Sequence, residues 1–322
     1  MIDAEGMTRR EVFAAAAVVG AAASGLFPTG SAQAHQAGFT MESAQYSWTP
    51  EPPQVPVTER MIDVGGARLW TWDTGGSGPA VVLLHAFTGS GATWGYQQPV
   101  LAAAGYRVIG YSRRGHFRSE SGPLDATGTL IGDLISIVDQ LGIDRFHLVG
   151  TAAGGFSVFD CALSHPDRLY SLTLASSLGG IDEAEYTAVS SQLLPPGWRE
   201  LPSEFREIGP SYRAANPAGT QRWIELEHAA LVGQRINQAR SNPITWANLQ
   251  TITTPALLMT GGADLYMPPA RLPQIAAHLP NSRWVAIPEA GHAAFWEQPD
   301  AFNRQLLAHF AATSPANDGP RS

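Results

Sequence analysis

Lysine is missing from the sequence, so all 20 cationic side chains among its 322 residues are arginines. Without lysine, a Walker-type phosphate site and any Schiff-base or pyridoxal-phosphate chemistry are excluded. Cysteine is nearly absent too, since the single Cys161 can form neither an intrachain disulfide nor a cysteine-clustered zinc or iron–sulfur site. The net charge of -8 argues against a basic face for a nucleic acid. These absences argue against a nucleotide, a metal cluster or a nucleic acid as the ligand, and no cofactor is implied.

The N-terminus has the parts of an export signal. Arg9 and Arg10 precede an apolar run over residues 12–26, and the small-residue sequence Ala-Gln-Ala follows at 32–34. A run of about 15 apolar residues is shorter than the roughly 20 that span a bilayer, so a cleaved signal is favoured over a membrane anchor. The pattern resembles a twin-arginine signal peptide over residues 1–34. We therefore expect a periplasmic or secreted protein with no membrane span.

The rest of the chain divides into an arm, one domain and a tail. Residues 35–57 are polar and rich in proline, which indicates an extended arm. With 44% hydrophobic and 15% charged residues, the chain can form one packed domain, expected over residues 58–312. Residues 313–322 are expected to be a disordered tail. The composition carries no signal for an oligomeric state.

Short apolar runs alternate with helical patterns along the domain. The strands are expected at 60–73 (a hairpin broken at two glycines), 80–85, 106–111, 146–150, 169–175, 255–260 and 284–287. The clearest helices are expected at 94–104, 131–142, 156–164 and 299–312. This alternation predicts an α/β fold, with a mostly parallel eight-stranded sheet flanked by helices.

The stretch from about residue 180 to residue 247 breaks this alternation because it is irregular, helix-rich and aromatic. An insertion of that length between parallel strands usually covers their carboxyl ends, where ligands bind. We predict a helical lid over 180–247, with a purely structural excursion as the alternative. Trp94, Trp223, Trp246 and Phe295 are candidates for substrate binding, although aromatic residues in helical stripes more often belong to the core.

One glycine-rich segment stands between a predicted strand and a predicted helix. It reads Gly-Thr-Ala-Ala-Gly-Gly over residues 150–155. A sharp turn in this context lifts one side chain above the edge of the sheet, and the flanking glycines let the strand and the helix approach closely. The residue at the tip of this turn is Ala152.

Further motifs each follow a predicted strand. They are Leu84-His85-Ala86-Phe87, the arginine-rich loop over 113–119, Gly261-Gly262-Ala263-Asp264 and Glu289-Ala290-Gly291-His292. In this order they resemble the α/β-hydrolase superfamily, in particular its capped enol-lactonase and haloperoxidase-like esterase branch. The resemblance covers roughly residues 58–312 and implies an α/β-hydrolase fold with a lid.

The resemblance also implies roles for individual residues. Asp264 would orient His292, which is the general base, and the backbone N–H groups of Phe87 and Ala153 would form an oxyanion hole. The chain departs from the family pattern at the nucleophile-elbow position, because the methyl group of Ala152 cannot attack a carbonyl. No neighbouring hydroxyl residue supplies the elbow geometry.

Three explanations for Ala152 stay open. The residue is an engineered replacement in an ordinary serine esterase, it belongs to an enzyme in which the His292–Asp264 pair activates water or acts as acid and base, or the chain is a non-catalytic binding protein. The presence of both Asp264 and His292 argues against the binding protein. We expect a hydrolase acting on a small, fairly apolar ester, lactone or related carbonyl substrate, with lyase or retro-aldol chemistry as the alternative.

The other histidines are interpreted as structural. His85 is expected to brace the oxyanion loop, His116 to support the residues that surround the site, and His147 to be a hydrogen-bonded core residue. A metal site formed by His85, His116 and His292 is disfavoured, because the motifs around these residues explain them better.

Overall fold

The computed structural model describes residues 50–314 except residue 235. The predicted signal peptide over 1–34, most of the predicted arm and the chain after residue 314 lie outside the described residues. The last helix continues to Thr313, one residue into the stretch predicted as a tail. None of the helices described combines the length and the hydrophobicity that crossing a membrane requires.

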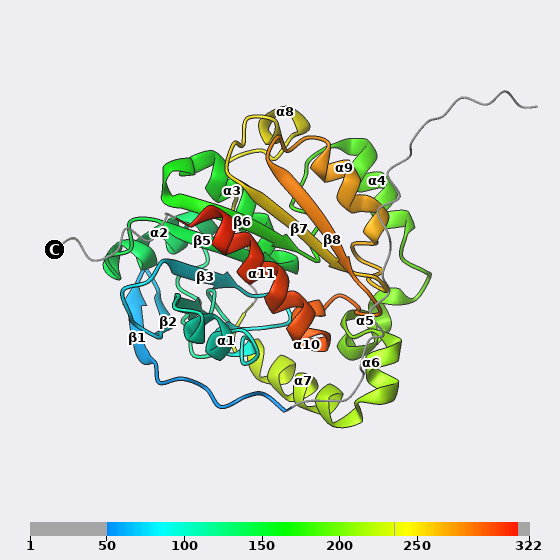
Figure 1. The fold of residues 1–322 in the computed structure, drawn as a ribbon, viewed down its shortest axis with the longest axis horizontal. Helices are drawn as coiled ribbons and strands as arrows, with labels where there is room; N and C mark the ends of the chain where they lie inside the picture. Colours follow the sequence, from blue (N-terminus) through cyan, green and yellow to red (C-terminus); the bar gives the residue numbers. More distant parts are fainter. Residues whose placement is uncertain (1–49, 235, 315–322) are drawn as a thin grey trace, which may run out of the picture. The chain divides into compact units, whose positions relative to one another are not determined.

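The described residues form one eight-stranded sheet in the order β1-β2-β4-β3-β5-β6-β7-β8 (Figure 1). β2 runs antiparallel to both β1 and β4, and the remaining neighbours are parallel. The prediction of a mostly parallel eight-stranded sheet is therefore confirmed. The strands are β1 Thr58–Asp63, β2 Arg68–Asp73, β3 Ala80–Leu84, β4 Arg107–Tyr111, β5 Phe146–Thr151, β6 Leu169–Ala175, β7 Ala256–Gly261 and β8 Ser282–Ile287.

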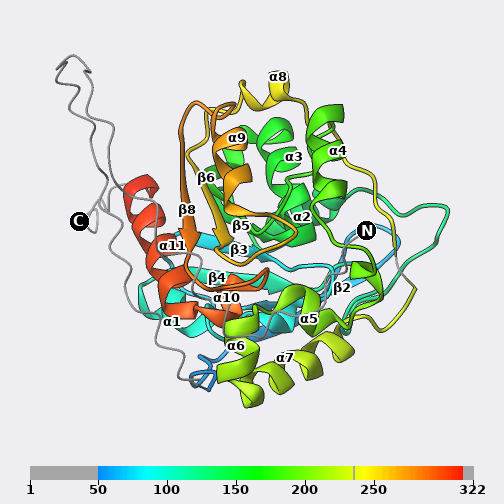
Figure 2. The ribbon, with the colours of Figure 1, turned by 90° about the vertical axis from the view of Figure 1, so that its right-hand side faces the viewer.

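Helices cover both faces of this sheet. Figures 1 and 2 show α1 and α11 on one face and α2, α3 and α9 on the other. The α-helices of the described residues are α1 Gln98–Ala103, α2 Leu130–Gln140, α3 Phe156–Ser164, α4 Ala184–Gln192, α5 Ser203–Glu207, α6 Pro210–Ala215, α7 Pro217–Ala230, α8 Trp246–Leu249, α9 Leu272–Ala276, α10 Ala294–Glu297 and α11 Pro299–Thr313.

The central strands bury side chains on both faces. In β3, Val81 and Leu83 belong to the core cluster that includes residues of α11, whereas Val82 and Leu84 belong to the cluster that includes residues of α2 and α3. Successive side chains of a strand point to opposite faces, so a parallel strand between two helical layers exposes neither face. This arrangement explains why β3 is an uninterrupted apolar run.

The stretch between β6 and β7 contains α4 to α8, as the helix-rich prediction for 180–247 expected. Figures 1 and 2 both show α5, α6 and α7 grouped near α10. The backbone N–H of Ala293, after β8, donates a hydrogen bond of 3.0 Å to the carbonyl of Glu207 at the end of α5. The inserted stretch is thereby attached to the loop that carries His292.

The turn from β5 into α3 packs directly against the end of β3. A Cβ atom added to Gly154 would lie 2.3 Å from the carbonyl oxygen of Leu84 and 2.9 Å from that of His85. No real Cβ atom tolerates backbone contacts this short. The predicted approach of strand and helix is present at Gly150, where an added Cβ atom would lie 2.6 Å from a methyl group of Val158 in α3.

We predict that Gly154→Ala lowers the free energy of unfolding by about 1–3 kcal/mol, because the added methyl forces β3 and the turn apart. Urea denaturation followed by circular dichroism measures the change. Gly132→Ala in α2 is the control, because its Cβ would meet only the hydroxyl of Thr129, at 3.0 Å. Equal stabilities for the two variants would contradict the prediction.

Candidate active site

The backbone at Ala152 adopts the conformation of a strained turn. Its φ angle is 49°, in the left-handed region that non-glycine residues rarely adopt. Ala152 follows β5 and begins a short 3-10 helix over Ala152–Gly155 that leads into α3. Thr151 is extended and buried, as expected for a residue that does not face the cavity. The elbow geometry is thus kept although the tip residue is alanine.

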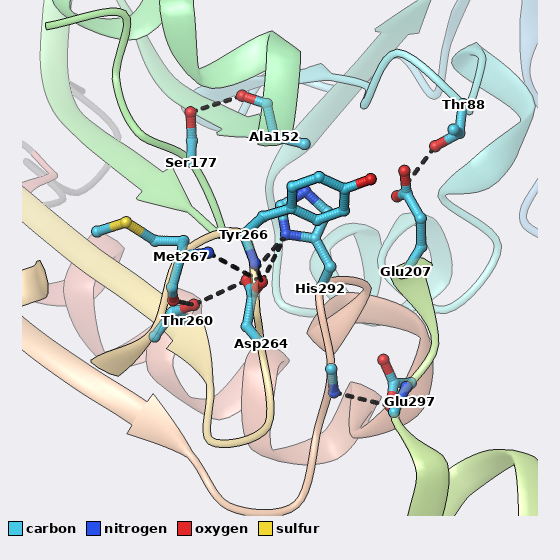
Figure 3. A network of polar contacts seen from close by, with 12 residues as sticks. Thr88, Ala152, Ser177, Glu207, Thr260, Asp264, Tyr266, Met267, His292 and Glu297 are labelled. Carbon is cyan, nitrogen blue, oxygen red and sulfur yellow. Dashed lines mark hydrogen bonds and ion pairs between the residues drawn. The ribbon is translucent and has the colours of Figure 1, made fainter. Parts of the chain in front are cut away.

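The side chains of His292 and Asp264 are in direct contact (Figure 3). Nδ1 of His292 lies 3.0 Å from Oδ1 and 2.9 Å from Oδ2 of Asp264. Asp264 also accepts hydrogen bonds from the hydroxyl of Thr260 at 3.0 Å and from the backbone N–H groups of Tyr266 and Met267 at 2.9 and 3.0 Å. These donors fix the orientation of the carboxylate, and the carboxylate fixes the imidazole.

Electrostatics favour an ion pair between these two groups. Burial alone would raise the pKa of Asp264, but His292 and the surrounding donors hold it below its ordinary value. Burial alone would lower the pKa of His292, yet Asp264, Glu207 and Glu297 raise it to about 9. Both shifts favour the pair of an imidazolium and a carboxylate.

Ala152 and His292 line one cavity of about 410 Å³. Loops after the strands supply one part of its wall, and the stretch between β6 and β7 supplies another. The wall consists of Phe87, Thr88, Ala152, Ala153, Phe156, Ser176, Ser177, Leu178, Ser203, Arg206, Glu207, Glu227, Ala230, Leu231, Tyr266, Met267 and His292. Charged side chains share the wall with apolar ones, so the cavity is more polar than the aromatic prediction implied.

The loop proposed for the oxyanion hole borders this cavity. Phe87 and Ala153 both line it. His116 Nε2 lies 3.1 Å from the carbonyl oxygen of Phe87, and His85 Nε2 accepts the backbone N–H of Arg113 at 3.0 Å. His85 and His116 therefore support this loop through hydrogen bonds and do not line the cavity, which is the structural role expected for them.

The four aromatic candidates do not line this main cavity. Trp246 stacks on His278 with ring centroids 4.3 Å apart, and Trp94 packs on Phe295 at 5.0 Å in the core. Trp223 and Phe295 border only a recess of about 10 Å³ beside Glu207 and His292. The substrate-binding assignment is thus corrected for Trp94 and Trp246, since Trp94 packs in the core and the half-buried Trp246 stacks on His278 instead.

Sequence reasoning missed several residues around His292. The ring of Tyr266 lies over the imidazole, with centroids 4.6 Å apart, and its position two residues after Asp264 was the one available signal. Glu207 and Thr88 meet across the cavity wall through a hydrogen bond of 3.1 Å from the Thr88 hydroxyl. No pattern in the sequence marks either residue, because their contact joins a loop to the irregular inserted stretch.

A second missed carboxyl, that of Glu297, lies behind the site. Its Oε2 atom accepts the backbone N–H groups of Gly209 and Gly291, both at 2.9 Å. Burial raises the pKa of Glu297 to about 8 in spite of these donors. Among the residues that the structure describes, no cluster of three or more histidine, cysteine or acidic side chains is arranged to hold a metal ion.

Comparisons with known proteins point to one family. The model of the alpha/beta hydrolase family matches residues 81–305. Epoxide hydrolase A of Mycobacterium tuberculosis is 27% identical, over 78% of this chain and 96% of its own. Two solved structures share the fold: a thermophilic esterase from Thermogutta terrifontis (TM-score 0.66, 23% identity, 81% of this chain and 100% of that chain) and the enol-lactonase from Burkholderia xenovorans (TM-score 0.65, 24% identity, 79% and 100%).

We predict that Ala152→Gly raises the free energy of unfolding by about 0.5–1 kcal/mol, because glycine adopts a φ of 49° without the steric cost that alanine incurs. Ala153→Gly is the matched control. Ala153 does not have a left-handed backbone, so this substitution should lower the free energy of unfolding by about 0.5–1 kcal/mol. Chemical denaturation measures both variants. Destabilisation by both substitutions would show that the elbow is not strained.

We predict that Glu297→Gln makes stability less dependent on pH. With its pKa raised to about 8 in the folded state and 4.5 as the ordinary value, Glu297 holds a proton that the unfolded chain releases. Its contribution therefore destabilises the fold as pH rises from about 4.5 to 8, by up to about 1.4 kcal/mol per pH unit. Glutamine keeps a carbonyl acceptor for both N–H groups and has no proton to lose.

Urea denaturation at pH 5 and pH 8 tests this expectation. The variant should gain stability relative to the unsubstituted protein between the two pH values. Glu185→Gln, which removes an exposed carboxylate from α4, serves as the control. An identical pH dependence in Glu297→Gln and the unsubstituted protein would contradict the assignment.

Proposed function

The chain belongs to the alpha/beta hydrolase family, and from this premise we propose that it hydrolyses a small ester, lactone or related carbonyl compound with water in place of the serine nucleophile. The observation that carries the proposal is the His292–Asp264 contact of 2.9 Å at a cavity that Ala152 also lines. The pair supplies acid–base chemistry, which contributes about 10²–10⁴-fold to a rate. When water attacks the carbonyl directly, no covalent intermediate forms between substrate and enzyme.

The cavity has room for this reaction at the tip of the elbow. A methyl group at position 152 leaves space that a serine hydroxyl would fill, and a water molecule has the size to occupy it. The carbonyl oxygen of the substrate would face the backbone N–H groups of Phe87 and Ala153, each worth about 3 kcal/mol in stabilising the developing negative charge. His292 then exchanges protons with the reacting groups, and Asp264 holds its ring in place.

The ion-pair contact also favours an enzyme over a binding protein. A buried imidazole–carboxylate pair stabilises a fold only weakly, because removing two charges from water offsets much of their attraction. A cavity that only bound a ligand would have no need for a proton carrier beside it. The charged wall of the cavity, with Arg206 and Glu227, further supports a substrate that carries polar groups.

We predict that the unsubstituted chain hydrolyses members of a panel of aryl esters and lactones, and that His292→Ala lowers kcat/KM by about 10²–10⁴-fold. Product analysis in ¹⁸O-labelled water tests the reaction class, because hydrolysis places the label in the product carboxylate. His278→Ala is the control, since that histidine stacks on Trp246 and does not line the cavity.

Unchanged turnover in His292→Ala would rule out the proposed mechanism. Product formed without label in its carboxylate would favour a lyase on the same scaffold. If Ala152→Ser created strong esterase activity sensitive to fluorophosphonates where none existed before, an inactivated serine esterase would be favoured instead.

A further inference from the structure

Glu207 is the acidic side chain at the cavity whose role the proposed function leaves open. It is the last residue of α5 and lines the same cavity as Ala152 and His292. Only 8% of its surface is exposed. Burying a carboxyl group to this degree costs free energy unless the group is paired. Its presence at the cavity therefore suggests a function.

We propose that Glu207 is a second catalytic residue, which takes the proton from the attacking water while the His292 imidazolium protonates the leaving group. This inference rests on the proposed function and divides the acid–base work between two side chains. Glutamate and histidine then perform the two proton transfers that direct attack by water on a carbonyl requires.

The position of the Glu207 carboxylate supports this role. Its Oε2 atom accepts the hydroxyl hydrogen of Thr88 at 3.1 Å, and Thr88 is the residue after Phe87 of the proposed oxyanion hole. In the view of Figure 3, the imidazole of His292 lies between the carboxylates of Asp264 and Glu207. The carboxylate is therefore held beside the proposed oxyanion loop, at the cavity that His292 also lines.

The charges that face the two groups assign the direction of proton transfer. Asp264, Glu207 and Glu297 all raise the pKa of His292, and this favours the doubly protonated imidazole. A doubly protonated imidazole cannot accept a proton, but it can donate one. The reaction therefore needs a base other than His292 in the cavity.

Glu207 has the electrostatic surroundings of such a base. Burial raises its pKa, and Asp264 adds to the shift, whereas His292, Thr88 and Arg206 oppose it. Glu227 of α7 lines the same cavity and brings a further negative charge toward it. A carboxylate with a raised pKa is a stronger base than an ordinary glutamate, and a nearby imidazolium stabilises its ionised form.

The reaction balances with these two residues and one water. Glu207 takes a proton from water as the water oxygen bonds to the carbonyl carbon, and the carbonyl π pair moves onto the oxygen. When that pair returns, the bond to the leaving oxygen breaks and His292 gives this oxygen a proton. The proton on Glu207 then passes through a second water to His292, which restores both groups and leaves an acid and an alcohol.

The experiment uses the full chain with phenyl acetate and δ-valerolactone as probes, and measures kcat/KM between pH 5 and pH 10. We expect a bell-shaped profile, which falls on the acid side as Glu207 gains a proton and falls above about pH 9 as His292 loses one. Glu207→Gln should lose about 10²–10³-fold in kcat and the acid limb of the profile. Glu207→Asp should restore part of the rate.

A chemical rescue separates catalysis from a structural role. In Glu207→Ala, added formate should restore turnover, because a small carboxylate can occupy the space and accept the proton. Glu204→Gln, on the same helix but outside the cavity wall, is the matched control and should keep both the rate and the profile. Circular dichroism melting curves verify that each variant is folded.

The outcomes distinguish this inference from the proposed function. If His292→Ala abolishes turnover but Glu207→Gln keeps the rate and both limbs, or formate rescues nothing, only the assignment of Glu207 is overturned. A rate that climbs through pH 9 to a plateau overturns it as well, because His292 is then the base. If the chain hydrolyses neither probe, or His292→Ala is fully active, the proposed function fails and this inference fails with it.

Discussion

The site depends on how closely the loop after β8 approaches the end of β7. A Cβ atom on Gly261 would lie 2.0 Å from the carbonyl oxygen of Gly291 and 2.2 Å from that of Ala290, so the two backbones are in direct contact. The backbone N–H of Ala263 donates to Ala290 at 2.8 Å and joins the same loops. Asp264 and His292 each lie one residue beyond these contacts. The contacts between the two backbones therefore place their side chains next to each other.

The elbow is maintained by its neighbours more than by its tip. Gly150 and Gly154 would each bring a Cβ atom within 2.6 Å of backbone atoms, so the path of the chain through the turn is fixed on both sides of Ala152. The left-handed conformation at Ala152 costs about 1–2 kcal/mol, and the surrounding packing retains it. The tip residue is therefore free to lack a hydroxyl while the cavity and the imidazole keep their relative positions.

The sequence was sufficient to predict the sheet, the elbow, and the meeting of Asp264 with His292. Each of these residues follows a strand, and the carboxyl ends of parallel strands share one edge of a sheet, so topology alone brings them together. The same reasoning could not locate Glu207, because the stretch between β6 and β7 has no periodic pattern that relates it to that edge. The prediction for the aromatic residues was wrong at Trp94 for a physical reason. A large apolar ring gains more from packing in the core, here against Phe295, than from lining a wet cavity.

Two carboxyl groups besides that of Asp264 act on His292. Asp264, Glu207 and Glu297 each raise the pKa of its imidazole, against the effect of burial. Two of them, Glu207 and Glu297, have raised pKa values, so they add less negative charge at neutral pH than their number implies. In the mechanism we propose, His292 and Glu207 supply an acid and a base in one cavity. In that mechanism the missing hydroxyl at position 152 and the acidic surroundings of His292 belong to the same chemistry.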